Sequence, residues 1–199
     1  MNEHLETGRK EQKLNTRSKI LMAAHEVLQK GKDLSMESVA AEANISRATI
    51  YRYYSNVDSL STELILHLNI PNTGNMVEEL RDKKVGAALL SIQNTYLDFI
   101  LNNEVAARKF LGAVLSSSDP KLVRGKNRLN TLQSYFDSKG LEWDKEKIEK
   151  LIHVAVLLMG IESVIVSKDV CGLDNAKTKE NLKWGLEMML KGMISSKDD

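Results

Sequence analysis

Side chains that could bind nucleic acid are concentrated in the short segment ANISRATIYRYY, residues 43–54. Arginine presents a rigid fork of donors to O6 and N7 of guanine, and the methyl groups of alanine and threonine can contact the methyl group of thymine. Serine and tyrosine hydroxyls suit phosphate oxygens. Because exposed clusters of tyrosine and arginine are unusual without a partner, we expect this segment to read DNA rather than to cover a solvated helix.

The residues around this segment predict two short helices joined by a tight turn. Ser35 is a good N-cap for a helix over residues 36–42, and Glu37 in its first turn suits the helix dipole. Asn44 tolerates the left-handed conformation of a turn, and Ser46 can cap the next helix. Such a pair is a helix-turn-helix, whose second helix enters the major groove in DNA-binding proteins.

The second of these helices has an inner and an outer face. Ile50 and Tyr54 lie one turn apart and would pack against a core shared with the first helix of the chain. The outer face carries the side chains that would reach DNA: Arg47, Ala48, Tyr51 and Arg52.

Composition is typical of a globular protein, with 42% hydrophobic and 28% charged residues among 199. The net charge of +1 means that any basic surface must come from placement. The single cysteine, Cys171, fits a reducing compartment. The N-terminus is too polar for a secretory signal, and the longest apolar run, residues 151–166, is too short to cross a bilayer. We therefore expect a cytoplasmic protein with no membrane partner.

Hydrophobic residues recur with helical period and no strand pair is evident, so the predicted fold is all-α with about nine helices. A polar arm is expected to precede a first helix from about Thr16 to Gly31, and a fourth helix should end before Pro71. Residues 71–75 form the clearest loop. Longer helices are expected at about residues 84–102, 104–116, 120–138, 145–168 and 176–195.

Residues 16–60 resemble the N-terminal domain of TetR-type (tetracycline-repressor-like) transcriptional regulators. The resemblance rests on TRSKILMAAHEVL and SMESVAAEANISRATIYRYYSNVDSL, including the order Ser-x-x-Thr-Ile-Tyr, then an aromatic residue and a leucine. It implies an N-terminal arm and helix-turn-helix domain over residues 1–57 and a larger helical ligand-binding and dimerisation domain over residues 58–199. It further implies a ligand-responsive repressor that binds a palindromic operator in double-stranded DNA as a homodimer.

The resemblance also implies individual DNA contacts. Residues 47–49 match positions that contact bases and nearby phosphates, and Tyr51 and Tyr53 match phosphate-contacting positions. Ser35 and Ser46 match capping positions near the DNA backbone. With the outward-facing Arg52 and a first-helix position often near phosphate, the candidate DNA-binding residues are Arg17, Ser35, Ser46, Arg47, Ala48, Thr49, Tyr51, Arg52 and Tyr53.

Two positions depart from the family pattern. Val57 stands where the family usually has a lysine, so one phosphate contact should be missing and the salt dependence should fall by about one unit of slope. Asn44 replaces the usual turn glycine, a mild change because asparagine accepts positive φ. Val57 also favours an alternative, a helical homodimeric protein-interaction module that has lost DNA binding, whereas Arg47 and Tyr51 argue for DNA.

The last helices carry more apolar surface than one chain can bury. Residues 151–166 are apolar nearly all round, and the last helix has a stripe made of Leu182, Leu186, Met189, Leu190, Met193 and Ile194. The resemblance implies that the last two helices pair with their copies in a four-helix dimer interface.

TetR-like proteins usually hold a small apolar or amphipathic effector inside the larger domain. Candidate lining residues are His67, Tyr96, Phe99, Ile100, Phe110, Val114, Tyr135, Met159 and Glu162, although aromatic residues and methionine at helical spacing are often only core. Glu162 lies within an apolar run, where a carboxylate is costly unless it is paired. It either binds a cationic or hydroxyl group of the effector or pairs with a lysine or another helix.

No catalytic pattern is evident. The four histidines are scattered without the spacing of metal ligands, and the chain has neither a Gly-rich phosphate loop nor a G-x-S-x-G motif. We therefore expect no enzymatic activity, no metal and no cofactor.

Overall fold

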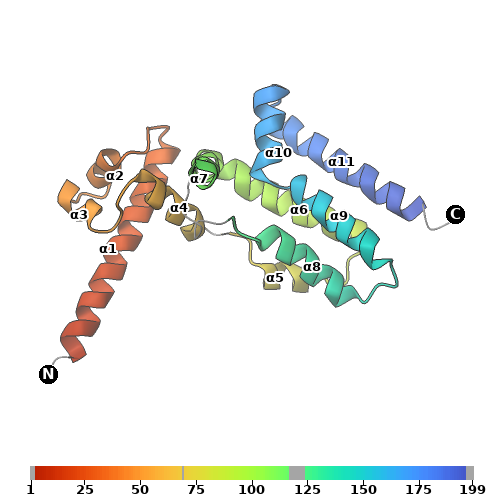
Figure 1. The fold of residues 1–199 in the computed structure, drawn as a ribbon, viewed down its shortest axis with the longest axis horizontal. Helices are drawn as coiled ribbons and strands as arrows, with labels where there is room; N and C mark the ends of the chain where they lie inside the picture. The colour runs from red at the N-terminus through yellow and green to blue at the C-terminus, as the bar shows by residue number, and fades with distance from the viewer. Residues whose placement is uncertain (1–2, 69, 117–123, 196–199) are drawn as a thin grey trace. The chain divides into compact units, whose positions relative to one another are not determined.

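The computed structural model describes residues 3–68, 70–116 and 124–195, and within these ranges it contains only helices and connections, with no strand (Figure 1). This confirms the predicted all-α fold. The described residues form eleven α-helices and one short π-helical turn, where the sequence predicted about nine helices. In chain order they are α1 (Glu3–Gln29), α2 (Met36–Glu42), α3 (Arg47–Tyr51), α4 (Val57–His67), α5 (Thr73–Leu80), α6 (Val85–Asn102), α7 (Glu104–Ser116), α8 (Asn127–Lys139), α9 (Lys145–Leu157), α10 (Ile161–Ile165), η1 (Val166–Val170) and α11 (Asn175–Ser195).

The helices group into two compact units. The first unit holds α1–α4 and α7, and the second holds α5, α6, α8–α11 and η1. The domain boundary predicted after residue 57 separates a DNA-binding part of the chain from an effector-binding and dimerisation part. Because that boundary concerns function, it stays a prediction.

The first helix is longer than predicted. It begins at Glu3, so the expectation of a polar arm before residue 16 was wrong. The prediction followed the apolar stripe, which begins only at Ile20, whereas the preceding residues are mostly Glu, Lys, Arg, Gln and Leu and contain no proline. These residue types favour a helix without any buried face.

The helix-turn-helix forms as predicted from local signals. Ser35 caps α2, where its hydroxyl accepts a hydrogen bond from the Ser38 amide and the Ser38 hydroxyl accepts one from the Ser35 amide, both at 3.0 Å. Asn44 adopts φ 49° in the turn. Ser46 then caps α3 by accepting the Thr49 amide at 3.0 Å. α1 packs against α2 and α4, and α2 against α3.

Substitution of Asn44 should test whether the left-handed turn limits stability. Asn44→Ala is expected to lower the free energy of unfolding by about 1 kcal/mol, because a Cβ without a local hydrogen-bonding group is disfavoured at positive φ. Asn44→Gly should change it by less than about 0.5 kcal/mol. Urea unfolding measures both, and equal values for the two variants would contradict this assignment.

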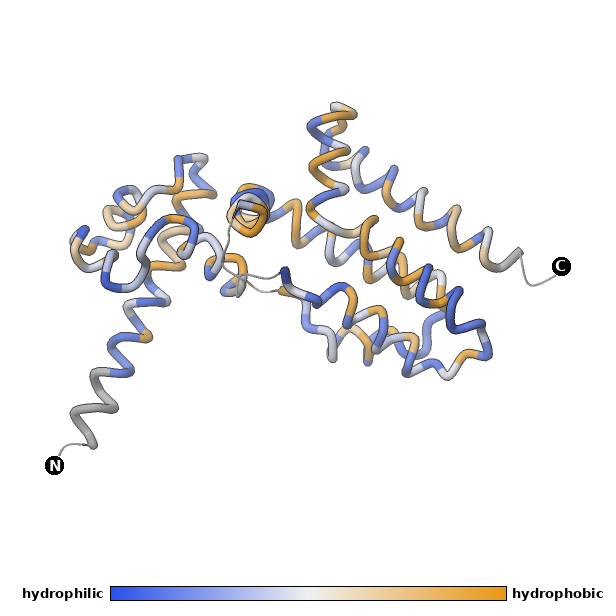
Figure 2. The backbone as a smooth tube through the Cα atoms, in the orientation of Figure 1, coloured by the Kyte–Doolittle hydropathy of each residue, from blue (hydrophilic) through white to orange (hydrophobic). Residues whose placement is uncertain are grey.

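The second unit is built around α6, which packs against α8, α10 and α11. Side chains with no exposed surface lie at the centre of this core, among them Leu89, Ile92, Leu132, Met159 and Leu186. In Figure 2, hydrophobic residues recur at short intervals along the helices of this unit. This pattern is what the helical period of the sequence predicts.

One helix lies partly in the segment predicted as a loop. α5 begins at Thr73 because the Asn72 side chain accepts the Asn75 amide at 3.0 Å. Met76 and Leu80, one turn apart, are buried against the core. The Pro-Asn-Thr-Gly-Asn composition therefore marks a helix start and not a loop of five residues. At the other connection, α8 begins at Asn127, later than predicted, and residues 120–123 lie outside the described residues.

The helix predicted over residues 145–168 is broken. α9 ends at Leu157 and α10 begins at Ile161, and the two parts are bent by 49°. Gly160 is extended at φ −108° and ψ 166°, and a Cβ there would collide with the Arg128 guanidinium. In the described ranges, no single helix has the length and apolar character to cross a membrane; α9 with α10 and η1 meets those criteria only as a bent pair, by length and composition.

Candidate functional site

The second helix of the helix-turn-helix presents the outer face that the sequence predicts. Arg47, Ala48, Tyr51 and Arg52 are exposed, whereas Ile50 and Tyr54 are buried. Tyr51 keeps 48% of its surface exposed, which is unusual for so large a side chain without a partner. Thr49 and Tyr53 are half-buried at the edge of this face, and Ser46 is exposed at its start.

An acidic residue of α2 holds the first arginine of this face. The Arg47 Nη2 donates a hydrogen bond of 2.5 Å to the Glu37 Oε1, and the side chains are 71% and 50% exposed. One nitrogen of the guanidinium is thus engaged. Sequence reasoning assigned Glu37 only to the helix dipole, because a contact ten residues away depends on how α2 and α3 cross.

Arg17 joins α1 to α4. Its guanidinium donates through Nε and Nη2 to the two carboxylate oxygens of Glu63 and lies 5.9 Å from the centroid of the Tyr54 ring. The hydrogen bonds to Glu63 raise the pKa of Arg17, and burial raises the pKa of Tyr54 to about 12. The Arg17 side chain is still 48% exposed, so its predicted phosphate contact stays a prediction beside this structural role.

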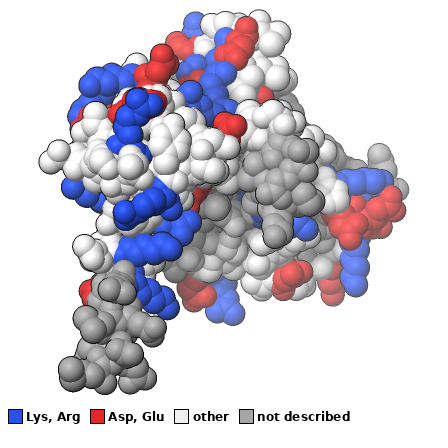
Figure 3. All heavy atoms as spheres, turned by 60° about the vertical axis from the view of Figure 1, so that its left-hand side comes forward, with Lys and Arg blue, Asp and Glu red and all other residues white. Residues whose placement is uncertain are grey.

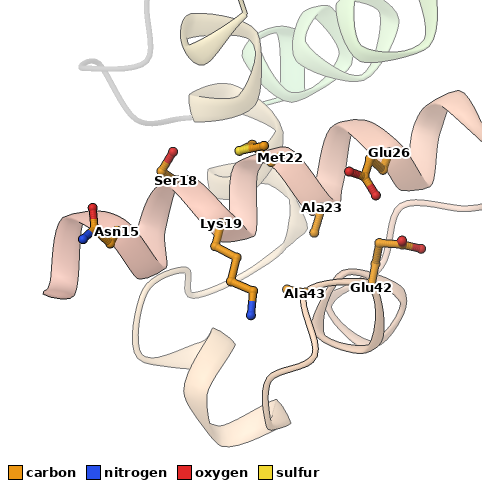
Figure 4. A pocket seen from close by; sticks show the side chains of 8 residues that line it. All are labelled: Asn15, Ser18, Lys19, Met22, Ala23, Glu26, Glu42 and Ala43. Carbon is orange, nitrogen blue, oxygen red and sulfur yellow. The ribbon is translucent and has the colours of Figure 1, made fainter.

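A hollow of about 320 Å³ lies between α1 and α2 in the first unit (Figure 4). Lys19 points from α1 toward the segment that joins α2 to α3, and the Glu26 and Glu42 carboxylates lie at the other end. Glu42 accepts a 2.6 Å hydrogen bond from Lys30. Most of the residues that line the hollow are polar, and Lys19 adds a further cation to the surface of this unit.

The effector candidates do not all lie in one unit. His67, Phe110 and Val114 belong to the first unit, where His67 is exposed and the other two are half-buried. The remaining candidates belong to the second unit: Tyr96, Phe99, Ile100, Tyr135, Met159 and Glu162.

Within the second unit, the two tyrosines are core residues with internal partners. The Tyr96 hydroxyl lies 2.9 Å from the Thr131 hydroxyl, and the Tyr135 hydroxyl donates to the Lys83 carbonyl at 3.1 Å. Burial raises the pKa of both phenols. Met159 is fully buried in the same core, Ile100 is buried and Phe99 is half-buried. Their assignment to an effector site stays a prediction.

Glu162 is paired with arginine. Its Oε1 contacts the Arg124 guanidinium and its Oε2 lies 3.4 Å from Arg128 Nη1, which also donates to the Val156 carbonyl at 3.2 Å. Burial lowers the pKa of Arg128, and the nearby charge of Arg124 acts in the same direction. Of the two interpretations of Glu162, this geometry supports pairing within the protein, and the partners are arginines.

Two hollows of the second unit are lined by other residues. The larger, about 680 Å³, lies where α8 turns into α9 and includes Phe136, Leu141 and Trp143. The smaller, about 340 Å³, lies between α9 and α11 and includes Val154 and Met189. Neither includes an effector candidate. Among the residues described here, no group of three His, Cys, Asp or Glu side chains could hold a metal ion.

Comparison with known proteins agrees with this geometry. Residues 20–64 match the family model for bacterial regulatory proteins of the tetR family. A curated relative, an uncharacterized HTH-type transcriptional regulator of Haemophilus influenzae, is 24% identical over 193 residues, which cover 94% of this chain and 92% of the relative. A solved TetR transcriptional regulator from Rhodococcus sp. RHA1 has the same fold, with a TM-score of 0.55 at 18% identity over 89% of this chain and 97% of that chain.

Proposed function

We propose that the chain is a homodimeric repressor of the TetR type that binds a palindromic operator and responds to a small molecule, because residues 20–64 match the family model for bacterial regulatory proteins of the tetR family. The observation that carries the proposal is the exposed face of α3, with Arg47, Tyr51 and Arg52 directed outward. In this scheme residues 1–57 bind DNA, and residues 58–199 bind the effector and form the dimer. The protein acts in the cytoplasm and catalyses no reaction.

The recognition helix α3 enters the major groove with its N-terminal end first. Arg47 reads the edge of a guanine, and the Ala48 and Thr49 methyl groups contact neighbouring bases. Ser35, Ser46, Tyr51 and Tyr53 bind phosphates and set the register, with Arg52 on the outer edge of the same face. Two such helices in a dimer meet successive major grooves about 34 Å apart, which requires a palindromic site.

Exposed apolar side chains support a dimer through the last helices. In the described part of the second unit, every large apolar side chain that is strongly exposed lies on α9, η1 or α11: Val154, Leu157, Val166, Val170 and Trp184. Leu157 and Trp184 expose 63% and 62% of their surfaces. Such residues are favoured at the centre of a protein interface, so α9–η1 and α11 are the surface through which two copies associate.

The wild-type protein is expected to have twice the mass of the chain in light scattering at micromolar concentration. Leu157→Lys/Trp184→Lys should give the monomer mass. Dimerisation would then remove two charged side chains of each copy from water, which is costly when they have no partner. Leu115→Lys is the matched control: Leu115 is 73% exposed on α7, outside the proposed interface. A dimeric double variant, or a monomeric wild type, contradicts the assignment of the interface.

Signal transmission runs through α4, the helix that follows the helix-turn-helix. The Arg17–Glu63 ion pair fastens α4 to α1, so a shift of α4 caused by the effector moves the DNA-binding helices with it. A coupling free energy of about 1–3 kcal/mol changes operator affinity 5- to 150-fold. The proposed effector site lies among the candidate residues of the larger domain, which include Tyr96, Tyr135 and Met159.

Selection of the purified protein against random DNA duplexes tests the proposal. Enrichment of a palindrome with half-sites one helical turn apart is the expected result. The alternative, a helical homodimer that binds another protein and no longer binds DNA, is favoured only by Val57 at the family's lysine position. Selection of no duplex by a folded dimer would support that alternative and exclude the repressor.

A further inference from the structure

One face of α1 changes character along the helix. Lys10, Lys13 and Arg17 follow each other at spacings of three and four residues, and Ile20 and Ala24 continue the same stripe. Ile20 and Ala24 are fully buried, so this face is directed toward the body of the first unit. Lys10 and Lys13 lie on the same face, N-terminal to the part of α1 that packs in the first unit, and both are exposed.

The N-terminal part of α1 is helical because of its residue types, and its side chains are not covered by the rest of the first unit. Every side chain from residue 10 to residue 15 is exposed, including Leu14 at 58%. Figure 2 shows this part of the tube as mainly hydrophilic, in contrast to the C-terminal half of the same helix. These exposed side chains are therefore available to a partner.

The charge on this part of α1 identifies the partner. Residues 10–19 carry four cations (Lys10, Lys13, Arg17 and Lys19) and one anion, Glu11. Figure 3 shows Lys and Arg side chains gathered in a band along α1 toward its N-terminal part. Lys10 and Lys13 make no ion pair with any residue whose side chain the structure describes. A cationic face where the apolar stripe ends is complementary to a polyanion.

Arg17 sets the position of this face relative to the recognition helix. It contacts Glu63 of α4 and lies over Tyr54, three residues after the end of α3. At 1.5 Å per residue, Lys13 and Lys10 lie about 6 and about 10 Å farther along α1. Duplex DNA presents a charge on each strand about every 3.4 Å of its axis, so a duplex that extends along this part of α1 offers several phosphates to the two lysines.

We propose that Lys10 and Lys13 bind backbone phosphates outside the base pairs read by α3, so that the N-terminal part of α1 extends the footprint of each subunit into the flanking DNA. This inference rests on the proposed function. The contacts carry no base information, so they raise affinity for all sequences and make binding depend on flank length.

The test compares Lys10→Gln/Lys13→Gln with wild type on the duplex that wild type selects, once with long flanks and once trimmed to the palindrome. Glutamine removes the charges and keeps a similar helix propensity. On the long duplex, the slope of log affinity against log salt should fall by about 0.9 for each phosphate that is no longer neutralised, or by about 3.6 for a dimer. On the trimmed duplex, the variant and the wild type should bind alike.

Lys84→Gln/Lys145→Gln is the matched control, since both lysines are exposed in the second unit. It should leave the slope unchanged on both duplexes. A double variant of Lys10 and Lys13 that selects the same palindrome and keeps the wild-type slope on long flanks overturns the inference and leaves the proposed function intact. A wild-type protein that selects no duplex overturns both.

Discussion

Arg47→Ala is expected to abolish the preference for one base pair in each half-site while leaving affinity for random DNA nearly unchanged. The arginine fork can donate to both O6 and N7 of guanine, and such a pair discriminates against the wrong base by about 1–3 kcal/mol. A symmetric dimer loses this twice, or about 2–6 kcal/mol in specific affinity. Competition titrations with duplexes substituted at each position measure the loss directly.

Two companion variants separate reading from positioning. Glu37→Gln keeps the size of the side chain but weakens its 2.5 Å hydrogen bond to Arg47. Because both groups are exposed, the free energy of DNA binding should change by less than about 1 kcal/mol. Tyr51→Phe removes a hydroxyl proposed to bind phosphate, so it should weaken specific and random duplexes alike. Equal losses on both kinds of duplex for Arg47→Ala would contradict its base-reading role.

The helix-turn-helix was predictable because its signals are local. Ser35, Asn44 and Ser46 each determine the backbone within three residues of themselves, and the structure confirms the caps and the positive φ. The division between the buried Ile50 and the exposed Arg47 follows from helical period alone. The outward face of α3 could therefore be predicted without knowledge of the tertiary fold.

The errors arose where contacts between distant residues decide the structure. At the break between α9 and α10, the side chains of Arg128 and Glu162 occupy the space that a side chain at position 160 would need. The Arg17–Glu63 pair joins residues 46 positions apart. Neither arrangement leaves a periodic signal in the sequence. The start of α1 was missed for a different reason, since a helix favoured by propensity has no apolar stripe to reveal it.

Gln93→Leu is expected to cause a larger loss of stability than any of the substitutions above. Gln93 is 1% exposed, and its amide nitrogen donates to the Leu158 carbonyl at 3.0 Å and to the Leu182 carbonyl at 2.8 Å. Leu158 is the C-cap of α9, where carbonyls lack helical partners. Removing these hydrogen bonds and leaving a buried carbonyl unpaired should cost about 2–4 kcal/mol in the free energy of unfolding.

Urea unfolding of Gln93→Leu and of Gln133→Leu provides the comparison. Gln133 is exposed on α8, so the same chemical change there should alter the free energy of unfolding by less than about 0.5 kcal/mol. Since Gln93 connects α6 to the end of α9 and to α11, the Gln93 variant should also dimerise less tightly. An unchanged unfolding midpoint would mean that packing alone holds the helix break. A destabilised variant that dimerises normally would mean that the break does not shape the surface carrying Leu157 and Trp184.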